Sequence, residues 1–235
     1  MILKKINFLK LITLIKVLIL YFSKDKLFYK FILNNRKFSI SQIYQDLFVF
    51  FHSKLITNGF FVEIGVGNGK DISNTYFLEK KKWKGILCEA DRRMIKEIKA
   101  NRDSKLVSIP ISNFCNKNFR FFENTKDPYL SGSKYNSEYK IRYTKSICVN
   151  HLLQKNKAPN IINYMSIDTE GNEYEIIKRI NFQKWKILII TIEHNFNIKK
   201  RNKIYNLLTK KNYKRVYPHL SYMDDWYILK NNQEI

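Results

Sequence analysis

The sequence predicts an α/β fold with a seven-stranded, mostly parallel sheet that ends in an antiparallel C-terminal hairpin. From residue 60 onward, short β-rich runs alternate with helical stretches whose apolar residues recur three and four positions apart, which is the pattern of βαβ units. The last two runs are separated only by the segment 218–225, which is too short for a crossover helix, so this pair must be antiparallel. A chain of 235 residues, 45% of them apolar, can bury one core of ordinary size.

The individual elements follow from these local patterns. Strands are expected at Phe60 to Ile64, Ile86 to Glu89, Leu106 to Ile109, Ile162 to Ile167, Ile187 to Glu193, Tyr213 to Tyr217 and Trp226 to Leu229. The clearest helices are expected at Ser73 to Lys82, Asp91 to Asn101, Glu173 to Ile180 and Lys199 to Lys211. The stretch from Phe119 to Lys145 breaks the alternation, so it is expected to form an inserted hairpin or a long loop.

The N-terminal segment is apolar but carries interspersed lysines. Within residues 1–22 the longest unbroken apolar stretch runs from Val17 to Phe22, far below the roughly 20 residues that a membrane-spanning helix needs. A signal peptide is also disfavoured, because Lys16 interrupts the apolar run and no small-residue cleavage site follows. We therefore expect a cytoplasmic protein whose residues 1–22 form a basic helix. That helix either lies on a membrane as a peripheral anchor or covers part of the domain.

Charge and cysteine content set wider limits. A formal net charge of +23 favours acidic partners such as nucleic acid, phosphorylated glycans or an anionic membrane, although the lysines are scattered and part of the excess can be compositional. Cys88, Cys115 and Cys148 are odd in number and far apart, so neither a disulfide framework nor a zinc knuckle is expected. A reducing compartment follows, with Cys88 as a small core residue.

Three of the seven glycines lie at alternate positions directly after the first strand, at Gly65, Gly67 and Gly69. Glycine lets the backbone turn sharply at a strand end and lets a ligand approach the main chain, so this loop is a candidate cofactor site. A tight turn without a ligand is the simpler alternative. A dinucleotide-dependent oxidoreductase is disfavoured, because its G-x-G-x-x-G spacing would place the third glycine at Lys70.

A carboxylate follows the glycine loop at a telling distance. Glu89 closes the second strand twenty residues after Gly69, the spacing expected for an acid that accepts hydrogen bonds from ribose hydroxyls. Alone, Glu89 would be an ordinary exposed residue at the end of a strand. Together with the glycine loop it predicts a nucleoside-binding role.

Two further strands end in polar side chains at the edge where open α/β sheets bind ligands. Asp168 and Glu170 follow the fourth strand of the predicted sheet and could orient a hydroxyl, act as a base or bind a metal, unless they are simply solvated. His194 follows the fifth strand and titrates near neutral pH, so it is a candidate proton acceptor. No histidine spacing in the chain is typical of a metal site, and no metal is predicted.

The spacing E-x-G-x-G-x-G matches the loop of class I methyltransferases, and longer segments resemble the FkbM family of methyltransferases. These segments, in family order, are SQIYQDLFV, GFFVEIGVGNGKDISNTYFLEKKKWKGILCEA, YMSIDTEGNEYEIIK, ITIEHN and DDWYILK. The resemblance implies a Rossmann-like class I methyltransferase fold at 41–235. Residues 1–40 lie outside the resemblance and are expected, from their composition, to form a basic apolar helical segment. The resemblance also implies S-adenosylmethionine as methyl donor and a hydroxyl of a sugar, glycan or secondary metabolite as acceptor.

The resemblance also assigns individual residues. Glu63 is placed near the methionine end of the cofactor, and Asn74, Gln42, Gln45, Asp46 and the DDW segment at 224–226 fall in family motifs, while Tyr44 stands where the family commonly has glycine. The combined hypothesis gives the cofactor to Glu63, Gly65, Gly67, Gly69, Asn74, Glu89 and Asp168. It places Asp168, Glu170 and His194 around the acceptor hydroxyl, with His194 or Asp168 as base.

Two other acceptor classes stay open at this stage. A nucleic-acid or protein methyltransferase would share the same cofactor half, although the chain has no Asn-Pro-Pro-Tyr-type signature for base methylation. A small molecule or glycan is the favoured acceptor, and nucleic acid is the less favoured partner.

Overall fold

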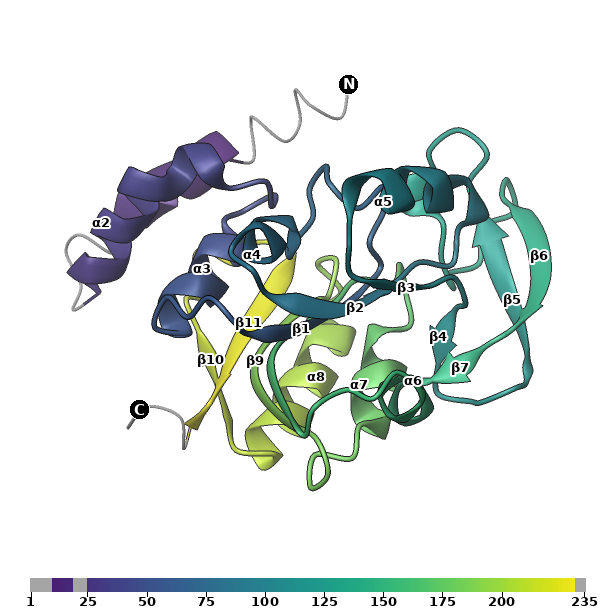
Figure 1. The fold of residues 1–235 in the computed structure, drawn as a ribbon. Helices are drawn as coiled ribbons and strands as arrows, with labels where there is room; N and C mark the ends of the chain where they lie inside the picture. The colour runs from purple at the N-terminus through teal and green to yellow at the C-terminus, as the bar shows by residue number, and fades with distance from the viewer. Residues whose placement is uncertain (1–9, 19–24, 231–235) are drawn as a thin grey trace.

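The computed structural model describes residues 10–18 and 25–230, and it confirms the predicted sheet. Seven strands lie in the order β10-β11-β9-β8-β1-β2-β3 (Figure 1). Their bounds are β1 (Phe60–Ile64), β2 (Lys84–Cys88), β3 (Lys105–Val107), β8 (Ile161–Ile167), β9 (Lys186–Glu193), β10 (Tyr213–Val216) and β11 (Asp224–Leu229). The five strands from β9 to β3 pair in parallel, whereas β11 is antiparallel to both β9 and β10. The C-terminal hairpin therefore forms as predicted.

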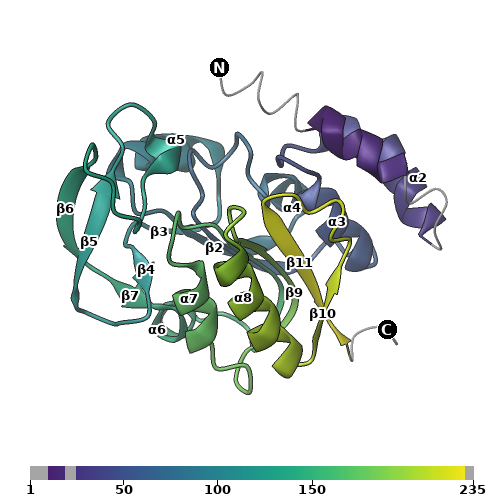
Figure 2. The ribbon, with the colours of Figure 1, turned by 180° about the vertical axis from the view of Figure 1, so that it is seen from behind.

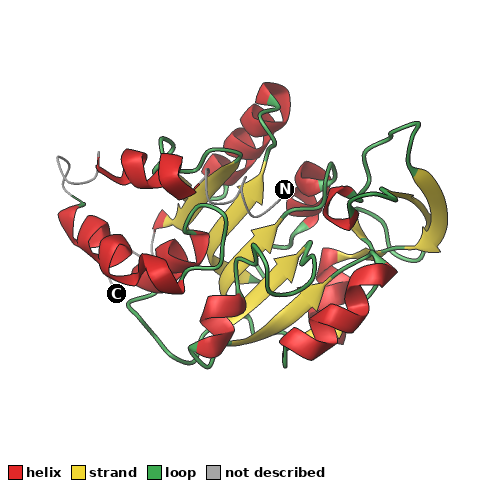
Figure 3. Ribbon diagram, turned by 90° about the horizontal axis from the view of Figure 1, so that it is seen from above, coloured by secondary structure: helices red, strands yellow, loops and turns green. Residues whose placement is uncertain are grey.

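Helices cover both faces of the sheet (Figure 3). The described helices are α2 (Lys26–Asn35), η1 (Arg36–Phe38), α3 (Gln45–His52), α4 (Tyr76–Lys80), η2 (Arg92–Met94), α5 (Ile95–Asn101), η3 (Pro128–Leu130), α6 (Val149–Lys155), α7 (Glu173–Arg179) and α8 (Ile198–Lys210). Figure 2 shows α7 and α8 in front of the sheet. The predicted helix at Ser73 to Lys82 is shorter, because its first residues form a turn that the buried Glu63 holds.

Strand residues alternate between two hydrophobic cores. In β1, Val62 and Ile64 join the core under α6, α7 and α8, whereas Phe61 joins the core under α3, α4 and α5. The same alternation continues in β2, where Ile86 and Leu87 belong to opposite cores. Because successive side chains of a strand point to opposite faces, runs that are apolar throughout are what a sheet covered on both faces requires.

The stretch that broke the predicted alternation forms an inserted hairpin. Antiparallel strands β5 (Asn118–Glu123) and β6 (Lys140–Lys145) lie beyond the β3 edge of the main sheet, at the right of Figure 1. A short parallel pair, β4 (Ile111–Ser112) and β7 (Ile147–Cys148), joins the two ends of the insert. The insertion therefore leaves the main sheet at one point and returns beside it.

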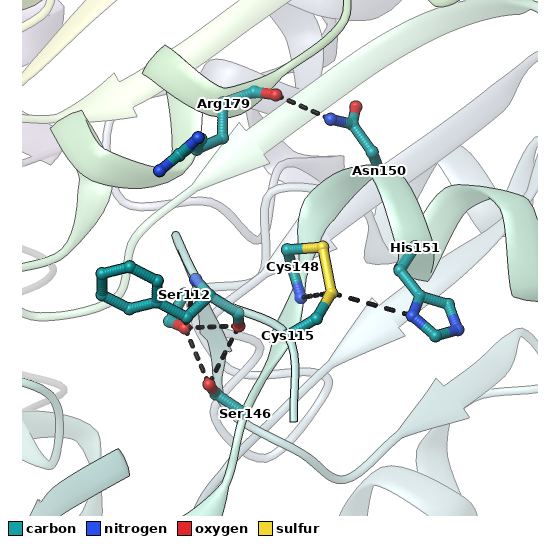
Figure 4. Close-up of a disulfide and its surroundings, with 8 residues drawn as sticks. Ser112, Cys115, Ser146, Cys148, Asn150, His151 and Arg179 are labelled. Atoms are coloured by element: carbon teal, nitrogen blue, oxygen red, sulfur yellow. Dashed lines mark hydrogen bonds between the residues drawn. A yellow bond between two sulfur atoms is a disulfide. The ribbon is translucent and has the colours of Figure 1, made fainter. Parts of the chain in front are cut away.

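The cysteine prediction was wrong. Cys115 and Cys148 form a disulfide with an S–S distance of 2.13 Å, and the His151 ring lies beside it (Figure 4). No sequence motif marks this pair, because the two cysteines meet only when β4 pairs with β7, which sets Ser112 opposite Cys148. Cys88 remains a free thiol in the core, 2% exposed, as predicted.

The N-terminal segment packs on the domain with one face and leaves another open. Residues 10–18 are helical, and most of the predicted segment 1–22 otherwise lies outside the described residues. Val17 joins Phe28 and Ile32 of α2 in the core under α3. On its outer face the helix exposes three apolar side chains, Leu11 at 55%, Ile15 at 59% and Leu18 at 49%. Within the described part of the chain, no helix is long and apolar enough to span a membrane.

The disulfide is expected to stabilise the inserted hairpin. The cysteines are separated by 33 residues, and closing a loop of that length in the unfolded chain is worth about 3–4 kcal/mol. Replacing both by serine should lower the melting temperature by roughly 10 °C, as should adding reductant to the wild-type protein, when followed by circular dichroism. The double serine variant should be indifferent to reductant, which is the control. Equal melting of the oxidised and reduced wild type would contradict this role.

Candidate functional site

A cavity of about 470 Å³ opens at the carboxyl edge of the parallel strands. The glycine loop and the ends of β2, β8 and β9 form its floor, and the inserted segment supplies a wall that includes Tyr129. The volume lies within the range of ordinary small-molecule sites. The site stands where strand order reverses across β1, with β2 on one side and β8 on the other, and this is the ligand-binding crevice of open α/β sheets.

Glycine is required at each of the three loop positions for a different physical reason. All adopt left-handed backbone conformations, with φ of +86° at Gly65, +59° at Gly67 and +84° at Gly69. A Cβ on Gly65 would lie 1.5 Å from the carbonyl oxygen of Asp168, whereas a Cβ on Gly67 would meet the Tyr129 ring at 2.4 Å. Gly65 and Gly67 line the cavity. Gly69 instead packs against α5 and is not among the lining residues, so the structure gives it a packing role.

Glu89 lines the cavity and also holds the loop. Its Oε2 accepts hydrogen bonds from the backbone N–H groups of Val66 and Gly67, at 3.1 and 2.9 Å, and its Oε1 accepts one from Asp91 N–H at 2.7 Å. Burial raises the pKa of Glu89 to about 7, and the N–H donors oppose this shift. The carboxylate therefore titrates near neutrality while Oε1 keeps one acceptor position.

Glu63 lines the cavity and is itself buried and hydrogen-bonded. It is 2% exposed and accepts hydrogen bonds from Asn74 N–H at 2.8 Å, from Thr75 Oγ1 at 2.6 Å and from Ser73 Oγ at 3.2 Å. Arg102 approaches it to 3.5 Å. Burial raises the pKa of Glu63, and the Arg102 guanidinium opposes that shift. Glu63 thus fixes the segment 73–75 against the sheet.

The residue that Glu63 positions carries a free acceptor. Asn74 lines the cavity, and its Nδ2 donates a hydrogen bond to Ser166 Oγ at 2.9 Å. Its Oδ1 is buried and has no hydrogen-bond partner. Buried polar atoms are normally paired, so this oxygen fits a ligand that brings a donor.

Three carboxylates gather on the other side of the cavity. One oxygen each from Asp168, Glu170 and Glu193 lies within 4.8 Å of the others. Burial, followed by the neighbouring carboxylates, raises the pKa of all three, that of Glu193 to about 11. Asp168 and Glu170 were predicted from the sequence, whereas Glu193 was not. The available signal was its place at the end of β9, directly before His194.

The structure places His194 outside the cavity lining, unlike the position expected of a base. The side chain is buried, 1% exposed, and His194 is not among the residues that line the cavity. Its Nδ1 accepts a hydrogen bond from Phe196 N–H at 3.1 Å, which leaves Nε2 to donate to the Asp224 carbonyl, also at 3.1 Å. Burial lowers its pKa. Both ring nitrogens are committed to the backbone, so His194 positions the chain after β9 and cannot reach an acceptor.

Two motifs of unassigned role meet beside the cavity. Gln45 of the N-terminal motif donates to Asp224 Oδ2 at 2.8 Å, and both residues line the cavity. Tyr44, which stands where glycine is common in the family, adopts a left-handed φ of 67°. The position therefore requires the backbone conformation that glycine adopts most readily. Burial raises the pKa of Asp224 to about 7, and the Gln45 hydrogen bond opposes this.

Strained backbone concentrates at the same edge. Five non-glycine residues that line the cavity have φ between 47° and 58°: Ile72, Glu170, Asn195, Phe196 and Tyr222. Residues with side chains avoid this region, and such strain accumulates at functional sites. Phe196 is 55% exposed, and its ring meets that of Tyr222 edge-on, with centroids 4.9 Å apart. The acceptor side of the cavity therefore has an aromatic rim.

Comparison with protein families gives one match. The model of the FkbM methyltransferase domain matches residues 63–216, well over half of the chain. This range begins at Glu63 and includes the glycine loop, Glu89 and the three carboxylates.

Solved methyltransferase structures are distant relatives in shape. Precorrin-6Y C5,15-methyltransferase from Geobacter metallireducens is 11% identical, with a TM-score of 0.44, and the alignment covers 78% of this chain and 85% of that one. The N-terminal domain of human METTL16, in complex with SAH, is 13% identical with a TM-score of 0.43, covering 81% and 70% of the two chains. A comparison with curated proteins found no match.

Proposed function

The chain belongs to the FkbM family of methyltransferases, and from this membership we propose that it methylates a hydroxyl oxygen of a glycan or secondary metabolite. S-adenosylmethionine is the methyl donor, as the resemblance implied. The observation that carries the proposal is that one cavity joins the glycine loop and Glu89 to the carboxylates after β8 and β9. A donor held by the first group and an acceptor held by the second would be neighbours, which is the alignment that methyl transfer requires.

The cofactor half fits S-adenosylmethionine through its donor and acceptor groups. Glu89 presents a carboxylate suited to ribose hydroxyls, and the buried Oδ1 of Asn74 suits the cofactor's amino group. Gly65, Gly67 and Glu63 also line the cavity, and Glu63 holds the backbone N–H of Asn74. When bound, the cofactor would supply a methyl group on a sulfonium: an oxygen nucleophile bonds to the methyl carbon, and the neutral thioether leaves.

The acceptor half favours a neutral hydroxyl. With His194 buried, Asp168 is the base of the proposed reaction, and Glu170 and Glu193 lie beside it. A carboxyl group with a raised pKa is a stronger base when ionised, which suits it to take a hydroxyl proton. The exposed Phe196 ring offers an apolar surface for the C–H face of a sugar.

The direct test is methyl incorporation from labelled S-adenosylmethionine. Neutral glycans, RNA and unfolded protein should be offered in parallel, and only the glycans should gain label. Phe196→Ala should raise KM for the glycan by about tenfold without weakening cofactor binding. Glu138→Gln, at an exposed site that does not line the cavity, is the control. Label in RNA or protein alone would replace the glycan with those acceptors.

Cofactor affinity is expected to depend on pH through Glu89. Its pKa is about 7, so the ionised form that accepts ribose hydroxyls is lost as pH falls through that value. Affinity measured by calorimetry should therefore drop about tenfold from about pH 8 to about pH 6. Glu89→Gln should bind the cofactor more weakly and show little pH dependence. A wild-type affinity that is constant over this range would contradict a ribose-binding role for Glu89.

We also propose that the N-terminal helix binds a membrane surface. Leu11, Ile15 and Leu18 are spaced along one face, are about half exposed and lie beside lysines, which is the composition of an interfacial helix. The wild-type protein should sediment with vesicles of anionic phospholipid, and a Leu11→Ser, Ile15→Ser double variant should remain in solution with unchanged melting. Wild-type protein that stays in solution with anionic vesicles would contradict the proposal.

A further inference from the structure

We propose that Asp168, Glu170 and Glu193 bind a divalent cation of the hard type, such as Mg²⁺ or Mn²⁺, on the acceptor side of the cavity. One carboxylate oxygen from each residue lies within 4.8 Å of the other two, so a single ion can contact all three. The ligands come from two neighbouring strand ends, β8 and β9, and all three residues line the cavity. The proposal rests on the proposed function for its purpose but not for its geometry.

A second observation points to a ligand at the same place. Glu193 is 7% exposed, and its Oε2 is buried without a hydrogen-bond partner. A buried carboxylate oxygen with no donor is costly, and native proteins normally supply a donor or a metal to such an atom. Since Glu193 belongs to the three-carboxylate group, the missing partner is one that the group shares.

The local charge balance requires a cation or protons. Glu173 and Asp224 are two further carboxylates beside the cluster. Lys200 is a cation beside Asp168 and Glu170, but its Nζ donates to Glu173 at 2.7 Å. Its charge is therefore paired with an acid outside the three ligands. A bound divalent ion would offset like charges that are otherwise forced together.

The ligand set selects the kind of ion. Three carboxylates without histidine or cysteine favour magnesium or manganese over zinc or copper. The nearby His194 is unavailable, because both of its ring nitrogens are hydrogen-bonded. Mg²⁺ prefers six oxygen ligands, so three protein oxygens leave coordination positions for acceptor hydroxyls and water. The cation would thereby orient an acceptor that carries neighbouring hydroxyls, as sugars do.

Manganese binding can be measured on the protein alone. Adding wild-type protein to Mn²⁺ at neutral pH should diminish the electron paramagnetic resonance signal of the free ion, and Mg²⁺ should restore it by competition. Glu193→Gln and Glu170→Gln should each weaken Mn²⁺ binding by about tenfold or more. Glu138→Gln removes an exposed acid elsewhere and should bind as the wild type does. Circular dichroism should establish that each variant is folded, and Glu170, on a turn, replaces Glu193 if the buried variant fails.

The outcomes separate this inference from the proposed function. A wild-type protein that leaves the Mn²⁺ signal unchanged at millimolar metal, or carboxylate variants that bind as the wild type does, would overturn the cation site. Cofactor binding measured by calorimetry in the presence of chelator tests the methyltransferase proposal separately. Mn²⁺ binding without any cofactor binding would support the cation site and sink the function, and the reverse result would do the opposite.

Discussion

The close approach of two strand ends at Gly65 is the constraint on which the site depends. The N–H of Gly65 donates to the Cys88 carbonyl at 2.9 Å, and the N–H of Asp168 donates to the Ile64 carbonyl at 2.8 Å, so the ladders of β2, β1 and β8 continue to the edge of the sheet. Only a residue without Cβ can stand there, because the Asp168 carbonyl fills that space and φ is +86°. This contact brings the nucleoside side and the carboxylate side into one cavity.

A second constraint fixes the loop above the sheet. Glu63 and Arg102 are both buried, and a charge pair in that position is stable only when its remaining donors and acceptors are satisfied. Arg102 meets this condition by donating to Glu79 at 2.6 Å, to the Gly69 carbonyl at 3.0 Å and to Thr75 Oγ1 at 2.8 Å. The same network ties α4 and α5 to the glycine loop. Glu63, which the family resemblance places near the cofactor, lines the cavity and also holds the segment that carries Asn74.

The features that could be predicted from the sequence are those that depend on local patterns of residues. Apolar runs, their spacing and the glycine cluster were enough to predict the seven strands, which of them are antiparallel, and the sheet edge that holds the cavity. These features follow from periodicity and from where each strand ends. The sequence does not show which side chain at a strand end faces the cavity. Glu193 and His194 are adjacent at the end of β9, and adjacent strand residues point to opposite sides. Sequence reasoning selected the histidine, whereas burial commits it to the backbone. The Cys115 to Cys148 disulfide and the Tyr129 wall depend on how the insertion folds back, which no local pattern encodes.

The exterior of the chain is basic, whereas the side chains on one side of its cavity are acidic. Binding of the protein to an anionic surface and the choice of a methyl acceptor therefore depend on different residues. A net charge of +23 attracts anionic surfaces, but that charge is spread over lysines outside the cavity. Inside, Asp168, Glu170 and Glu193 meet any acceptor with carboxylates. The attraction of a polyanion to the exterior therefore does not decide which molecule enters the cavity. In the proposed cation site, an acceptor beside Asp168 would meet the bound ion together with the carboxylates. A neutral glycan carried on an anionic membrane would suit both the basic exterior and the carboxylates of the cavity.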